Sequence, residues 1–188
     1  GLPSGNMGKI GIAISPQKPD IIYAAIELNR TKGGLYKSTD MGASWKKQSD
    51  AVSGATGPHY YQELYASPHE FDKLYLMDVR IQVSENGGKS FSRLPERDKH
   101  SDNHAIVFRP DDPNYLMIGT DAGIYESHDD AANWRFINNL PLTQYYKVAV
   151  DDQEPFYYVY GGTQDNGSHS GPSRTTEREG IRNAHWYK

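Results

Sequence analysis

The chain of 188 residues contains no cysteine, which excludes disulfides, thiolate zinc sites and a cysteine nucleophile. It also lacks a run of Lys or Arg. Its 20 basic residues are scattered along the chain and are outnumbered by 24 acidic ones, which gives a net charge of -4. Without a basic stripe to displace counterions from a phosphate backbone, we expect no nucleic-acid partner. No apolar stretch approaches the ~18 residues of a membrane-spanning helix, so no membrane insertion is expected either.

Glycine, proline and tyrosine are plentiful, at 18, 11 and 14 residues, whereas hydrophobic residues make up only 36% of the chain. This composition is typical of many short strands joined by tight turns. The predicted fold class is therefore all-β.

Four stretches of the sequence share one pattern: an alternating strand, a turn rich in Pro and Asp, and a second strand rich in Tyr, Ile, Leu and Val. They read GKIGIAISPQKPDIIYAAIE, HYYQELYASPHEFDKLYLMD, DNHAIVFRPDDPNYLMIGTD and QYYKVAVDDQEPFYYVYGGT. A repeat of this kind predicts successive four-stranded antiparallel blades of a β-propeller.

A second motif, Ser-x-Asp-x-Gly-x-x-Trp, follows the third strand of the first three predicted blades, and the fourth has no recognisable copy. Its complete copy is formed by Ser38, Asp40, Gly42 and Trp45. The other copies consist of Ser84, Asn86, Gly88 and Phe91, and of Ser127, Asp129 and Trp134 with Ala131 in the place of the glycine. The serines lie 46 and 43 residues apart, which fits the ~40 to 50 residues of one blade.

The motif is interpreted as a structural corner. A short hydroxyl or carboxylate accepts hydrogen bonds from backbone N–H groups that a hairpin leaves unpaired, and glycine permits a positive φ. Asn86 replaces the aspartate in the second copy. An amide still accepts a hydrogen bond but cannot act as a general acid or a carboxylate nucleophile, so a catalytic role for this position is disfavoured.

Residues 1–188 are predicted to form a single propeller segment of about four blades. The approximate blade bounds are 8–49, 59–95, 102–140 and 144–188, the last being divergent or incomplete. We expect a larger ring, completed by sequence outside this chain or by another copy of it. The alternative is a complete small domain, since four blades is the lower limit for a closed propeller.

The corner motif resembles the Asp-box, or bacterial neuraminidase repeat, of sialidases, xyloglucan-cleaving glycoside hydrolases and sortilin-type receptor propellers. The chain looks most like large bacterial repeat proteins described as glycosyl-hydrolase-like or sortilin-like. The resemblance implies an exported protein, secreted or periplasmic. The first residues, GLPSGNMGKI, lack the layout of a signal peptide, so the export signal is expected outside this sequence.

If the motif closes the turn between the third and fourth strands, the entry loops and the second-to-third turns lie at the opposite end of the blades. Propeller pockets usually open there. Three carboxylates are the candidate catalytic residues, Asp78, Asp121 and Asp165, since paired acids suit glycoside hydrolysis. Glu27 and Arg30 lie in the same loops, and the candidate binding residues are Tyr60, Tyr61, Arg80, His104, Tyr145, Tyr146, Gln164 and Asn166. Each aspartate taken singly also fits a simple turn cap.

The segment HSDNH provides a candidate metal site. If a strand begins this early, His100, Asp102 and His104 alternate and face one side, a set that suits zinc or another divalent metal. The alternative is a polar role at the channel mouth, with the histidines binding water or substrate hydroxyls.

Three functions remain open at this point. The first is polysaccharide handling, as a glycan binder or as a glycoside hydrolase with paired carboxylates. The second is a non-catalytic, sortilin-like scaffold that binds a peptide or protein, and the third is a purely structural fragment. Sialidase activity is not supported, because no arginine motif of that kind is present, and no Gly-x-Ser-x-Gly nucleophile elbow occurs.

Overall fold

The computed structural model describes residues 1–29, 32–54, 57–140 and 143–188. Arg30, named above among the loop residues, lies outside the described part. The chain divides into two compact units, Gly1–Ile137 and Asn138–Lys188. No helix in the described ranges is both long and apolar enough to cross a membrane.

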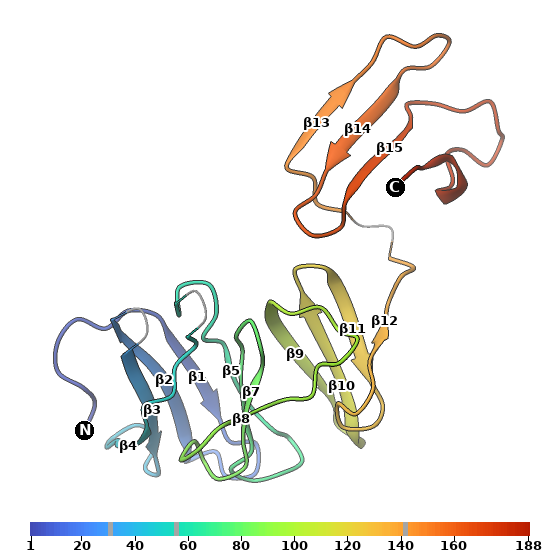
Figure 1. Cartoon of the computed structure of the whole chain (residues 1–188). Coiled ribbons are helices and arrows are strands. Elements are labelled where there is room, and N and C mark those ends of the chain that lie inside the picture. The colour runs from blue at the N-terminus through green and yellow to red at the C-terminus, as the bar shows by residue number, and fades with distance from the viewer. Residues whose placement is uncertain (30–31, 55–56, 141–142) are drawn as a thin grey trace. The chain divides into compact units, whose positions relative to one another are not determined.

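The first unit contains three four-stranded antiparallel sheets, each with its strands in chain order (Figure 1). The first sheet comprises β1 (Ile10–Ile14), β2 (Ile22–Asn29), β3 (Lys32–Ser38) and β4 (Lys46–Ser49). The second comprises β5 (Leu64–Ala66), β6 (Leu74–Leu76), β7 (Gln82–Ser84) and β8 (Ser92–Arg93). The third comprises β9 (Asn103–Arg109), β10 (Asp112–Thr120), β11 (Gly123–Ser127) and β12 (Arg135–Phe136). The prediction of consecutive antiparallel strands in an all-β chain is confirmed.

The second unit contains a fourth sheet of three antiparallel strands, β13 (Lys147–Val150), β14 (Tyr158–Gly162) and β15 (Ser168–Pro172). A short 3-10 helix follows, η1 (Asn183–His185), and Tyr187 then forms an antiparallel bridge with Ser170. The end of the chain therefore returns to the edge of this sheet.

Two apolar cores lie between neighbouring sheets of the first unit, and a third apolar cluster, Ala24, Ile26 and Tyr36 with Leu28 and Trp45, belongs to the first sheet alone. Between the first and second sheets, Tyr23, Ala25 and Leu35 pack with Leu64, Leu74 and Leu76. Between the second and third, Tyr75, Met77 and Val83 pack with Ile106, Leu116 and Ile118. Because successive side chains of a strand point to opposite faces, the second sheet buries one face against the first sheet and the other against the third.

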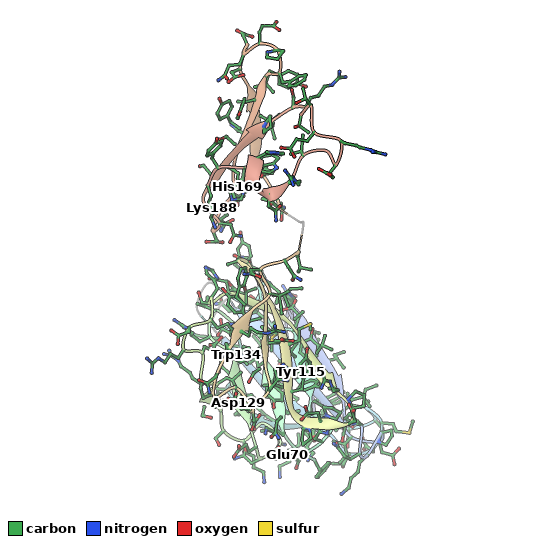
Figure 2. All side chains as sticks on the ribbon, turned by 90° about the vertical axis from the view of Figure 1, so that its right-hand side faces the viewer. Glu70, Tyr115, Asp129, Trp134, His169 and Lys188 are labelled. Atoms are coloured by element: carbon green, nitrogen blue, oxygen red, sulfur yellow. The ribbon has the colours of Figure 1, made fainter. Side chains whose placement is uncertain are left out.

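The three corners have the same hydrogen bonds. The serine Oγ accepts from the backbone N–H four residues later, at 2.8 Å in Gly42, 2.8 Å in Gly88 and 3.0 Å in Ala131. The serine hydroxyl also donates to the side chain two residues on, Asp40, Asn86 or Asp129. That side chain in turn accepts from a backbone N–H four residues further along. Asp129 and Trp134 of the third corner are labelled in Figure 2.

Each corner is also hydrogen-bonded to its own sheet at the first hairpin turn or, for Asn114 of β10, just after it. The N–H groups of Met41, Gly87 and Asp130 donate to the carbonyls of Asp20, Asp72 and Asn114 at 2.9, 2.8 and 2.9 Å. These bonds place the corners and the first hairpin turns at one end of each sheet. The strand-entry loops and the second hairpin turns therefore lie at the other end.

We expect Ser84→Ala to lower the free energy of unfolding by about 1–3 kcal/mol, because the buried Gly88 N–H loses its acceptor. Chemical denaturation measures this change. The matched control is Ser90→Ala, in which an exposed hydroxyl is removed but the backbone bond to Asn86 remains, and we expect a change within about 0.5 kcal/mol. Equal effects of the two substitutions would contradict the assignment.

Candidate functional site

Four of the predicted site residues come together at the end of the first unit opposite the corners. Tyr61 precedes β5, Asp102 precedes β9, His104 is the second residue of β9, and Asp121 lies in the turn between β10 and β11. Residues from two neighbouring sheets thus meet where the entry loop of the third sheet passes the second.

Tyr61 lies at the centre of this cluster, with 4% of its surface exposed. Its hydroxyl donates to Oδ1 of Asp102 at 2.8 Å, and its ring stacks on that of His104 at a centroid distance of 5.3 Å. Burial raises the pKa of Tyr61, and the hydrogen bond to Asp102 and the negative charges of Asp102, Asp121 and Asp78 raise it further. The phenol therefore stays protonated and acts as a donor.

Asp102 is held as an anion. Burial acts to raise the pKa of this carboxyl, but the hydrogen bonds from Ser101 and Tyr61 and the nearby His100 and His104 outweigh it, and the pKa lies below its usual value. The Ser101 hydroxyl donates to Oδ2 at 2.6 Å. An ionised carboxylate accepts hydrogen bonds or a proton, so Asp102 does not fit the role of a general acid at neutral pH.

His104 and Asp121 form the more exposed half of the cluster. Nε2 of His104 lies 2.7 Å from Oδ1 of Asp121, and both side chains are partly open to solvent. A ligand at the surface can therefore reach an imidazole and a carboxylate together, whereas the Tyr61 ring is buried.

Aromatic rings extend the cluster across the surface. His59 lies 4.7 Å from Tyr60, and Tyr60 lies 6.4 Å from Tyr61, between ring centroids. Tyr60 is 63% exposed. His59, Tyr60, Tyr61 and His104 are called the aromatic row below. His59 was not among the predicted site residues, although its place beside two tyrosines in the entry loop was visible in the sequence.

Asp78 has a different environment from Asp121. It is buried, and its carboxylate accepts from the N–H groups of Gly54 and Val79 and from the amide of Gln82, at 3.1, 2.8 and 3.0 Å. These bonds tie the second hairpin turn of the second sheet to the preceding loop. Both carboxylate oxygens are occupied by donors of the chain itself, which fits a structural role.

The predicted metal trio is not assembled as a ligand set. The prediction that the side chains of His100, Asp102 and His104 alternate along one strand is wrong, because β9 begins only at Asn103 and Asp102 has a φ of 61°. His100 Nδ1 lies 2.9 Å from the Ser101 carbonyl, while His104 is directed to Asp121. Within the ranges that the structure describes, no three His, Asp or Glu side chains are grouped to hold a metal ion.

The entry loop of the third sheet contains a buried ion pair. Lys99 Nζ is 2.7 Å from Oε1 of Glu96, and their side chains are 0% and 2% exposed. The Asn103 amide donates to the same Glu96 oxygen at 2.9 Å and to the Val79 carbonyl at 3.0 Å. Sequence reasoning missed this pair, because charged residues in a loop ordinarily face water.

The remaining predicted residues belong to other loops. Arg80 is exposed in the second hairpin turn of the second sheet, and Glu27 accepts from the backbone N–H of Lys9 at 3.0 Å. In the second unit, the Tyr145 hydroxyl lies 3.0 Å from Nδ1 of His169, a residue the sequence did not single out, and Tyr146 hydrogen-bonds Gln164. Asp165 and Asn166 lie in the turn between β14 and β15, where the Asn166 N–H donates to Thr163 at 2.9 Å.

No protein-family profile matches the chain. Among curated proteins, the oligoxyloglucan-reducing end-specific xyloglucanase of Emericella nidulans is 28% identical over 148 residues. That alignment covers 70% of this chain and 18% of the relative, so the chain spans less than a fifth of the curated relative's length.

Solved structures resemble the chain in fold. The GH74 enzyme of Niastella koreensis has a TM-score of 0.56 at 18% identity, over 87% of this chain and 28% of that one. YCF48 from Cyanidioschyzon merolae has a TM-score of 0.52 at 15% identity, over 94% and 60%. YCF48 bound to D1 peptide has a TM-score of 0.51 at 14% identity, over 94% and 54%. These structures are β-propellers, and the chain has the fold of part of a β-propeller.

Proposed function

We propose that the chain is the glycan-handling part of a glycoside-hydrolase-like β-propeller, and that the aromatic row with Asp121 contacts the sugar. The 28% identity to a xyloglucanase supports a carbohydrate ligand. As finer parts of the same proposal, the corners are Asp-boxes, the four sheets are blades with the bounds 8–49, 59–95, 102–140 and 144–188, and the protein works outside the cytoplasm.

The observation that carries the proposal is the series of neighbouring rings from His59 to His104, in which His59, Tyr60 and His104 are accessible and the buried Tyr61 supports them. A pyranose ring presents C–H groups on its faces and hydroxyls at its edge. A tyrosine ring offers a flat apolar surface with a polar tip, so it can pack on such a face while neighbouring groups bind the hydroxyls. His104 and Asp121 supply these neighbouring groups, and both are accessible to solvent.

We expect the chain to be retained by immobilised xyloglucan, and Tyr60→Ala to bind roughly fivefold more weakly, since one lost stacking contact is worth about 1 kcal/mol. Affinity electrophoresis or calorimetry against a panel of soluble polysaccharides measures the effect. The control is Tyr157→Ala, which removes an exposed tyrosine from the second unit. No retention on any glycan, or equal losses in both variants, would contradict the proposal.

Retention without cleavage is the expected result for this surface. Hydrolysis needs one carboxyl that delivers a proton and a second, ionised one that attacks or activates water. Asp102 is ionised and cannot deliver the proton, and its two oxygens already accept from Tyr61 and Ser101, so it is poorly placed to attack or activate water. An assay for released reducing ends tests this expectation by comparing the unchanged protein with the variant Asp121→Asn. Release by the unchanged protein but not by this variant would show that Asp121 is catalytic and that the surface does more than bind.

A further inference from the structure

Gln62, which directly follows Tyr61 in the entry loop of the second sheet, has an unusual backbone for its residue type. Its φ is 89°, in the left-handed region that favours glycine, and its side chain is fully buried. A long side chain persists in this conformation only where its surroundings hold it there, and such positions cluster at binding sites. The conformation of Gln62 therefore points to a role besides packing.

Gln62 and Glu63 form a β-bulge. The Gln62 N–H donates to the Met77 carbonyl at 3.3 Å, and the Met77 N–H donates to the Glu63 carbonyl at 2.8 Å. Two residues thus oppose one, immediately before the regular pairing of Leu64 with Leu76. In one class of bulge the first residue has a positive φ and is usually glycine, and bulges beside functional sites re-aim a side chain.

Two other segments of the chain hold the bulge in place. The side-chain Oε1 of Gln62 accepts from the Ser53 N–H at 2.7 Å. Strand β1 of the first sheet passes so close that a Cβ on Gly11 would lie 1.8 Å from the Gln62 carbonyl oxygen. Neither the side chain nor the backbone of Gln62 can therefore shift without displacing a neighbouring segment.

Glutamine at this position lowers stability in two ways. Its φ is positive, and its Nε2 is buried without a hydrogen-bond partner within the ranges that the structure describes. Glycine would avoid both costs, but it would leave the Ser53 N–H without its acceptor. Gln62 thus combines a bend in the backbone with an anchor for the loop that carries the tyrosines.

The residues on the two sides of Gln62 contact different sheets. Tyr61 contacts Asp102 and His104 at the start of the third sheet. The Glu63 carboxylate instead pairs with Lys9, which directly precedes β1 of the first sheet, at 2.6 Å. Residues two apart in a regular strand share one face and would reach the same neighbour. The positive φ between Tyr61 and Glu63 accounts for this divergence.

We propose that Gln62 is a positioning residue for the aromatic row. Its backbone conformation aims Tyr61 at the third sheet, where the buried ring stacks on His104 and orients that imidazole beside Asp121. Gln62 is itself buried and acts only through Tyr61. The inference rests on the proposed glycan-binding role of the row, and it explains why a strained residue adjoins it.

Nuclear magnetic resonance of His104 tests the positioning without any glycan, with His104→Gln to identify the signals. Tyr61 stacks on the imidazole at an interplanar angle of 20°, so its ring shields the C–H protons of His104, and Tyr61→Leu is expected to shift their resonances downfield. Gln62→Val is expected to shift them in the same direction, since a β-branched residue is strongly disfavoured at a φ of 89°. Gln62→Gly adopts this φ freely and is expected to leave them in place.

The affinity for xyloglucan is the second measurement. Gln62→Val is expected to bind roughly fivefold more weakly, because a misplaced Tyr61 no longer supports the accessible rings, whereas Gln62→Gly is expected to keep most of the affinity. The matched control is Met41→Val. Met41 also has a positive φ, of 57°, but it lies in the first corner, at the end of the sheets opposite the aromatic row. Met41→Val is expected to lower stability while both the His104 resonances and the affinity stay unchanged.

A substitution in the first sheet reaches the aromatic row by a separate route. Gly11→Ala places a methyl group against the Gln62 carbonyl oxygen and displaces the bulge. It is therefore expected to shift the His104 resonances, although Gly11 belongs to a different sheet from either ring.

Circular dichroism verifies that each variant is folded. Unshifted His104 resonances in folded Gln62→Val, an equal shift in Met41→Val, or a shifted Gln62→Val that binds xyloglucan as tightly as the unchanged protein would each overturn the inference. If Gln62→Val does not fold, Gly11→Ala decides in its place, and unshifted resonances there overturn the inference. Shifted resonances in a protein that binds no glycan would support the positioning of Tyr61 and contradict the proposed function alone.

Discussion

Replacing Lys99 by methionine lowers the free energy of unfolding by about 3–5 kcal/mol, because the carboxylate of Glu96 is left buried without its counter-charge. Burial lowers the pKa of Lys99, while Glu96 acts to raise it, which shows how strongly the lysine depends on this partner. The remaining donors to Glu96 are the Asn103 amide and the Ile81 N–H, and neither carries a positive charge. With a total stability of about 5–15 kcal/mol for a typical domain, such a loss is large. Denaturant titration measures it.

The double variant Glu96→Gln with Lys99→Met is the matched control. Removing both charges also removes the desolvation that each requires, so most of the stability is expected to return. A double variant as unstable as Lys99→Met alone would show that shape, and not charge, explains the effect.

Gly88→Ala is expected to destabilise the protein by about 2–5 kcal/mol, through the sum of backbone strain and overpacking. Gly88 has a φ of 85°, and a Cβ at this position would lie 1.5 Å from Cδ2 of Leu35 in the first sheet. Leu35 is fully buried in the core between the two sheets, so its side chain cannot move aside cheaply. The measurement is again the free energy of unfolding.

Gly42, the equivalent glycine of the first corner, distinguishes the effect of backbone strain from that of overpacking. Gly42 has a φ of 90°, but a Cβ there would meet only Trp45, at 3.7 Å, and Ile22, at 3.9 Å. Gly42→Ala is therefore expected to lose only about 1 kcal/mol, from strain. The third corner carries Ala131 at a φ of 70°, so alanine is compatible with this backbone. Losses of the same size at both glycines would contradict a role for the Leu35 contact.

The fold was predictable because its signals are local and repeat. The alternation of IGIAI, the turn after Ser15-Pro16 and the corner at Ser38 each specify a few residues of backbone. Because these local patterns occur three times, they predict consecutive antiparallel strands, and no long-range contact has to be known. The corner side chains also have the hydrogen bonds that their chemistry suggests.

The candidate site was predictable only in part. Tyr61 and Asp121 lie in loops and His104 at the start of a strand, and the topology brings all three to one end of the sheets, so their proximity follows from the strand order. The positive φ of Asp102 does not follow from sequence, and it breaks the alternation on which the metal hypothesis depended. The Lys99 and Glu96 pair was also hidden, because whether a loop charge is buried depends on the packing of two sheets.

The bond from each corner to the first turn of its own sheet has a consequence for synthesis. Every strand pairs with its immediate neighbours in the chain, and the corner closes the unit by reaching back only to residues such as Asp20, Asp72 or Asn114. A sheet can therefore be completed as soon as its own residues have left the ribosome, before the next one is translated. Nascent chains from which Ser49 or Arg93 has just emerged from the ribosome should already protect the corner amides from hydrogen exchange, and the chain folds vectorially, one sheet at a time.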